Sequence, residues 1–154
     1  MKTTIASLSA LVPLVGFAVL APYATIAEEG FARSGSVRIK KECTEYSGAA
    51  GAFCTITASN IPAIPIGAKV LYDQAAGIPA NMLDSNVVLD AGNGNWALGR
   101  CTLNLQNGVG LCTFSDGTGR LAGFEARVDV APPEDGINWT WRGTYKFNNP
   151  GRVQ

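Results

Sequence analysis

Histidine is missing from all 154 residues of the chain, and charged residues make up only 16% of it. Without an imidazole, neither a Ser-His-Asp nor a Cys-His nucleophile can be assembled, and the usual catalytic metal sites lose their commonest ligand. The stretch "GNGNW" at 92–96 lacks the spacing and the following helix of a phosphate-binding loop. We therefore expect neither phosphoryl nor acyl transfer, and we expect no cofactor and no bound metal.

Net charge is also lacking, because 12 basic residues balance 12 acidic ones. A neutral chain has no basic field for nucleic acid or an anionic membrane, so we expect no nucleic-acid partner. One basic concentration is present, and two glutamates follow it directly. We interpret this cluster as a solvated strand face. Its basic residues are Arg33, Arg38, Lys40 and Lys41.

Long apolar runs are confined to the N-terminus, where the stretch 5–20 follows a single lysine and precedes small residues. This layout is typical of a secretory signal peptide. We predict a signal peptide over residues 1–27, with cleavage after Ala27, and a single domain over residues 28–154. An uncleaved membrane anchor remains the alternative. The predicted location is secreted, either periplasmic or extracellular.

Only four cysteines are present, and they form two pairs with ten residues inside each pair. Export would place them in an oxidising compartment, which favours two disulfides. Directly opposed residues of an antiparallel hairpin enclose an even number of residues when the turn is even-numbered, and their Cα atoms are close enough for a disulfide. We therefore predict the bonds Cys43–Cys54 and Cys101–Cys112. Zinc is a poor alternative at this spacing.

Glycine, in contrast, is abundant, with 18 residues spread along the chain. Short alternating stretches recur between turn signals, which is typical of β-strands. Eight such strands favour an all-β fold, an eight-stranded antiparallel β-barrel that carries two hairpin disulfides. A two-sheet sandwich is the alternative fold. The expected strands are 36–44, 52–59, 68–73, 86–92, 96–104, 110–115, 120–130 and 137–147.

The last expected strand alternates most clearly, with aromatic side chains on one face and polar ones on the other. An aromatic face at strand spacing is ordinarily core, but it also suits the wall of a ligand pocket. Tyrosine hydroxyls would add hydrogen bonds to a ligand. The candidate ligand-binding residues are Tyr72, Trp139, Trp141 and Tyr145.

Glu125 is the one candidate for catalysis. It shares a strand face with Arg127 and Asp129, opposite an apolar face. If the apolar face packs the core, Glu125 faces solvent. If the barrel is locally inverted, Glu125 lies in the interior with a raised pKa and serves as a general acid or base.

The segment 92–130, with the turn "FSDGTG" at 114–119, "LAGF" at 121–124 and the final "WRGTYKF" at 141–147, resembles bacterial secreted proteins of the allene oxide cyclase barrel-like group. These are related in fold to plant allene oxide cyclases and dirigent proteins. The resemblance spans roughly residues 70–147 and consists mostly of turn and packing positions. It implies an eight-stranded barrel whose apolar interior holds a hydrophobic or phenolic ligand, and no catalytic motif carries over.

These observations favour a secreted barrel that binds a small apolar or aromatic molecule. One alternative is a cofactor-free cyclase or isomerase that uses the shape of the interior and one carboxylate such as Glu125. The other is a surface interaction module without a ligand. Whether the protein is an enzyme, which ligand it takes and whether it forms a homo-oligomer stay open.

Overall fold

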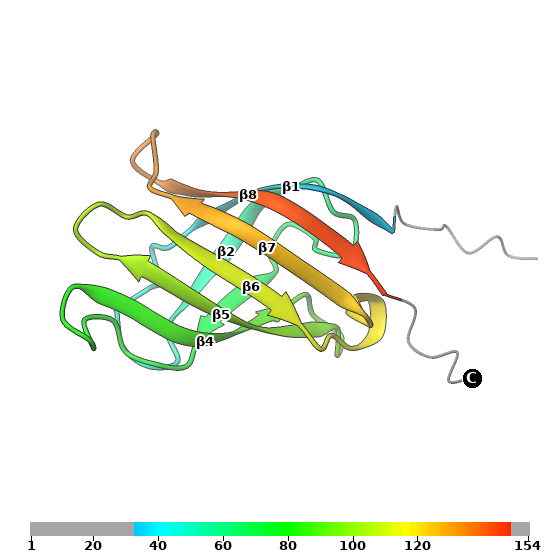
Figure 1. Ribbon diagram of the computed structural model, residues 1–154, viewed down its shortest axis with the longest axis horizontal. Helices are drawn as coiled ribbons and strands as arrows, with labels where there is room; N and C mark the ends of the chain where they lie inside the picture. Colours follow the sequence, from blue (N-terminus) through cyan, green and yellow to red (C-terminus); the bar gives the residue numbers. More distant parts are fainter. Residues whose placement is uncertain (1–32, 149–154) are drawn as a thin grey trace, which may run out of the picture.

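The computed structural model describes residues 33–148, which form one closed barrel (Figure 1). Each strand pairs antiparallel with the next in sequence, and β8 closes the ring against β1. The predicted all-β barrel is thereby confirmed, while the predicted signal peptide 1–27 lies outside the described residues. The strands are β1 (Ser34–Glu42), β2 (Phe53–Ser59), β3 (Lys69–Tyr72), β4 (Met82–Asp90), β5 (Trp96–Asn104), β6 (Gly110–Ser115), β7 (Phe124–Ala131) and β8 (Asn138–Phe147).

Most strands lie within two residues of their expected bounds, and two begin elsewhere. β4 begins at Met82, four residues before the prediction, because Leu83 and Ser85 continue its inward-facing row. The polar residues around them had indicated a loop. β7 begins only at Phe124, since a 3-10 turn over Gly119–Leu121 occupies its expected start. Among the described residues, no helix is long or apolar enough to cross a membrane.

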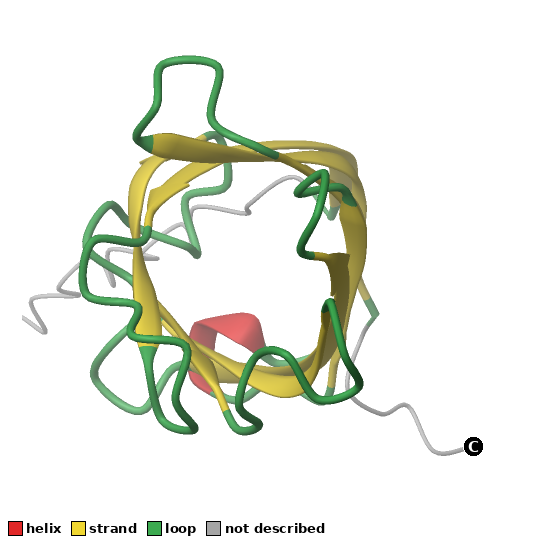
Figure 2. Ribbon diagram, turned by 90° about the vertical axis from the view of Figure 1, so that its left-hand side faces the viewer, coloured by secondary structure: helices red, strands yellow, loops and turns green. Residues whose placement is uncertain are grey.

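Viewed end-on, the strands form a continuous ring (Figure 2), and inward-facing side chains fill it. The alternation of buried and exposed residues along each strand places one apolar row inside the barrel. At the centre, the Phe114 ring packs between Trp141 and Phe124. Its centroid lies 5.3 Å from that of Trp141 and 6.5 Å from that of Phe124. The space left between these side chains is about 10 Å³, which is no more than one water molecule needs.

Two strands approach each other closely at Gly143 of β8. A Cβ atom added there would lie 2.0 Å from the carbonyl oxygen of Arg127 and 2.8 Å from the Cα atom of Val128. Both are backbone atoms of β7, so they have little freedom to move aside. Only glycine allows the β7–β8 pairing at this point.

Both predicted disulfides are present. Cys101 and Cys112 are directly opposed in the β5–β6 hairpin, with a Cα–Cα distance of 4.1 Å. Cys43 and Cys54 join the end of β1 to β2 at a Cα–Cα distance of 4.3 Å. Each bond links the two strands of one hairpin, as the parity of the spacing predicts.

The two ends of the barrel differ. At one end, the connection between β2 and β3 buries Ile61 and Ile64. The 3-10 turn, whose Leu121 is also buried, contacts this connection through a hydrogen bond from Arg120 to the Pro62 carbonyl. The other end holds the loop 43–52 between β1 and β2. Tyr46 of this loop packs against Tyr72 at the end of β3, with ring centroids 5.1 Å apart. This second end contains the only buried charge among the described residues.

Candidate functional site

That charge belongs to Lys41, whose exposed fraction is 4%. The expectation that the whole basic cluster forms a solvated face is wrong for this residue. Strand β1 alternates, and Lys41 continues the inward row that begins with Val37 and Ile39. Opposite it, β2 is irregular, since Lys40 pairs with Ala58 and Lys41 with Ile56. An extra residue in β2 at this point preserves the inward alternation of both strands.

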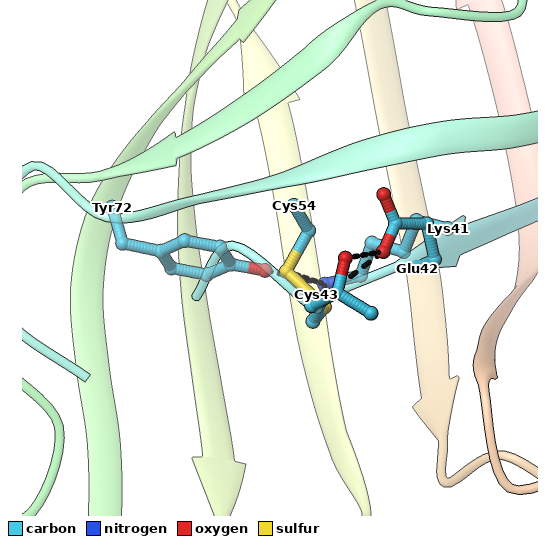
Figure 3. The surroundings of a disulfide bond; sticks show 6 residues. Lys41, Glu42, Cys43, Cys54 and Tyr72 are labelled. Carbon is cyan, nitrogen blue, oxygen red and sulfur yellow. Dashed lines mark hydrogen bonds between the residues drawn. A yellow bond between two sulfur atoms is a disulfide. The ribbon is translucent and has the colours of Figure 1, made fainter. Parts of the chain in front are cut away.

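The Lys41 amine lies between a phenol and a disulfide (Figure 3). Its Nζ atom donates a short hydrogen bond to the Tyr72 hydroxyl. Nζ is also 3.7 Å from Sγ of Cys54 and 4.0 Å from Sγ of Cys43. The ring face of Trp141 completes its surroundings, with its centroid 5.2 Å from Nζ, whereas Tyr72 presents its hydroxyl edge to the amine.

Burial dominates the electrostatics of this site. Loss of hydration lowers the pKa of the Lys41 ammonium from 10.5 to about 7. The ring face of Trp141 attracts a cation and opposes this lowering. No carboxylate among the described residues points into the barrel, and the neighbouring Glu42 is held outside by hydrogen bonds from Thr44 that lower the pKa of its carboxyl group. At neutral pH the amine is therefore divided between its two protonation states.

Tyr72 and Tyr46 are affected in the opposite sense, because burial raises the pKa of both phenols. The Tyr46 hydroxyl and the Trp141 Nε1 atom are buried without a hydrogen-bond partner. The other buried polar side chain, Ser85, is satisfied, since its Oγ atom donates to the Asn86 carbonyl and accepts from the Gln74 amide. Unpaired polar atoms thus occur on the two aromatic residues packed around the Lys41–Tyr72 pair.

The structure brings the predicted ligand-binding residues to the barrel interior. Tyr72 and Trp141 contact Lys41 directly. Trp139 is partly buried against the core, and it pairs with Lys41 across the β1–β8 ladder. Tyr145 lies farther along β8, buried with Phe124 and Phe147. Of the four, Tyr72 and Trp141 are the two in contact with the amine.

Glu125 points outward from β7. Its carboxylate forms an ion pair with Lys146 Nζ at 2.9 Å and accepts a short hydrogen bond from Asn148. These contacts lower the pKa of the Glu125 carboxyl group, with the Lys146 hydrogen bond as the largest cause. Of the two positions considered for Glu125, solvent-facing and interior, the structure shows the solvent-facing one. A groove of about 530 Å³ on the outer face of β6–β8 includes Glu125, Arg127 and Lys146.

Lys41 was missed at the sequence level because its neighbours suggested a charged surface. The alternation itself contained the signal, since Val37 and Ile39 fix the inward parity and Lys41 shares it. What alternation does not provide is the identity of the contacts. Tyr72 comes from β3 and Trp141 from β8, and only barrel closure brings both to β1.

The donor atoms of this site do not suit a metal, and no group of metal-ligating side chains occurs among residues 33–148. The amine, the phenols and the indole instead suit an oxygen-bearing or aromatic partner. Comparison of the chain with family models, with curated proteins and with solved structures found no match.

Proposed function

We propose that the protein binds a small aromatic molecule with an acidic oxygen, such as an aromatic carboxylate or phenolate, at the Lys41 end of the barrel. The observation that carries this proposal is a buried amine without a carboxylate partner among the described residues. Such a group destabilises the fold unless something compensates it, so its presence suggests a functional role.

The surroundings of the amine support the chemical class. An acidic oxygen would accept a hydrogen bond from Lys41 and supply the missing negative charge. The ring face of Trp141 favours an aromatic body beside it. The unpaired Tyr46 hydroxyl and Trp141 Nε1 atom are further donors in the same region.

The space for such a ligand lies at the barrel end. The centre is packed, with about 10 Å³ unfilled. Tyr46, in contrast, belongs to a loop and is only partly buried. A change of its side-chain rotamer would open the region beside Lys41 without disturbing the strands. We infer that the ligand enters past Tyr46.

The cyclase alternative depends on a different residue than expected, because Glu125 lies on the outer face. Lys41 and Tyr72 would have to supply the acid and base. Similarity to allene oxide cyclases stays a prediction from the sequence, since no matching family or structure supports it. The outer groove, together with the packed centre, favours the interaction-module alternative as the second candidate function.

A titration distinguishes these candidates. The oxidised protein is titrated with 1-anilinonaphthalene-8-sulfonate, an aromatic anion, and with uncharged N-phenyl-1-naphthylamine, while probe fluorescence is recorded. We expect the anion to bind more tightly than the neutral probe, and Lys41→Met to weaken anion binding at least tenfold. Lys146→Met, on the outer face, should leave it unchanged. Equal binding by the wild type and Lys41→Met would overturn the proposal, and sensitivity to Lys146→Met would move the site to the outer groove.

A further inference from the structure

The two disulfides of this protein have the same spacing but different surroundings. Both enclose ten residues and both join the strands of a hairpin. Cys101 and Cys112 are each 2% exposed, within the apolar core. Cys54 is equally buried, but Cys43 is partly exposed at the barrel end. Of the four disulfide cysteines, Cys43 is thus the one that is partly exposed.

The charge near the two bonds differs as well. The Lys41 Nζ atom lies 3.7 Å from the buried Cys54 sulfur, and Lys41 is the one buried cation among the described residues. The Cys101–Cys112 bond therefore has no buried ammonium beside it. A positive charge close to a sulfur lowers the pKa of its thiol and makes it a better leaving group.

We propose that Cys43–Cys54 is a thiol-exchange site, in which an external low-molecular-weight thiolate attacks Cys43 and Cys54 leaves as a thiolate held by Lys41. The new bond joins the external sulfur to Cys43 Sγ, and the Cys43–Cys54 bond breaks with its electron pair on Cys54 Sγ. A second external thiolate then attacks the external sulfur of this mixed disulfide and releases Cys43. Overall the two cysteines gain two electrons, and two external thiols are oxidised to their disulfide.

This exchange does not depend on the proposed aromatic ligand. It requires only the amine, the partly exposed Cys43 and an external thiol. Tyr46 and Tyr72 stay uncharged at neutral pH, because burial raises the pKa of both phenols. Neither phenol therefore competes with the released thiolate for the positive charge of Lys41. The groups that contact the Lys41 amine are the Tyr72 phenol of β3, the uncharged Trp141 ring of β8 and the two disulfide sulfurs, and Tyr46 of the loop 43–52 packs against Tyr72.

The test uses the oxidised protein, reduced glutathione at pH 7.5 without denaturant, and quenching with N-ethylmaleimide at timed intervals. Trypsin then places the two bonds in separate peptides, residues 42–69 and 101–120, because cleavage follows Lys41, Lys69, Arg100 and Arg120. Mass spectrometry measures how fast each bond opens and which cysteine holds glutathione. We expect Cys43–Cys54 to open at least tenfold faster, with glutathione on Cys43.

Lys41→Met separates the effect of charge from that of exposure. A fall of roughly two units in the pKa of the leaving thiol corresponds to about a tenfold faster exchange, for a sensitivity of about one half. Because only about a quarter of Lys41 is protonated at pH 7.5, the variant should open Cys43–Cys54 about threefold more slowly at this pH, while Cys101–Cys112 opens at the wild-type rate. An unchanged rate at Cys43–Cys54 would overturn the proposal, as would glutathione on Cys54.

A second measurement needs no variant. The wild-type rates are recorded from pH 6 to 9 and divided by the thiolate fraction of glutathione. As the pH rises past 7, Lys41 loses its proton and its assistance, so the corrected rate at Cys43–Cys54 should fall relative to that at Cys101–Cys112. A ratio independent of pH would contradict the role of the amine even if Lys41→Met failed to fold.

Discussion

Removal of the buried amine should make the folding stability of this protein less dependent on pH. The variant is Lys41→Met combined with Tyr72→Phe, because methionine alone would leave the buried Tyr72 hydroxyl without its partner. Methionine and phenylalanine preserve most of the volume of the residues they replace, so the barrel should keep its packing.

The magnitude follows from the two pKa values of the amine, 10.5 when exposed and about 7 in the fold. Between these values the unfolded chain holds a proton that the folded chain has lost, so the free energy of unfolding rises with pH. From pH 7 to 9.5 the gain is about 3 kcal/mol, and the attraction of the Trp141 ring face reduces it. Below pH 7 the full cost of charging the buried amine is present.

The assay is urea unfolding at intervals between pH 6 and 9.5, with both disulfides intact. The upper limit avoids the ionisation of tyrosines in the unfolded chain. The double variant should be more stable than the wild type at pH 7, and this advantage should shrink towards pH 9.5. Lys40→Met, which removes a lysine from the outer face of the same strand, is the control and should show no such trend. A stability difference between wild type and double variant that stays constant over this range would refute the burial of an uncompensated amine.

Three other experiments test the fold. Replacing Cys101 and Cys112 by alanine should lower the free energy of unfolding by about 3 kcal/mol, the loop-closure value for a ring of this length, as measured by urea unfolding. Gly143→Ala should destabilise the protein by about 3 kcal/mol or more, because its Cβ atom meets backbone. The control Gly136→Ala has open space around the new Cβ atom but a φ of +75°, and it should cost about 1 kcal/mol. Similar losses of stability for the two variants in thermal unfolding would refute the close approach at Gly143. Hydrogen bonds from the backbone amides of residues 137 and 138 lower the pKa of the Asp135 carboxyl group to about 2. Asp135→Asn should therefore lower the melting temperature above pH 4, and the difference from the wild type should disappear as the pH falls through about 2.

The sequence by itself determined the fold class of this protein. Period-two alternation and turn signals are local properties, so they located the strands before any tertiary contact was known. Cysteine parity is equally local, because both partners of each bond lie in one hairpin. The start of β4 was missed since Asp84 and Ser85 suggest a loop, and only pairing with β5 along its full length makes Met82–Asn86 a strand.

The tertiary structure alone decided the chemistry of the interior. Alternation placed Lys41 on the inward face of β1, but closure of the ring decided that its side chain is buried. It also supplied Tyr72 and Trp141 from strands that are distant in the sequence. The same closure placed Glu125 outside with Lys146. Whether a charged side chain is solvated or buried depends on what covers it, and that is a property of the assembled barrel rather than of its strands.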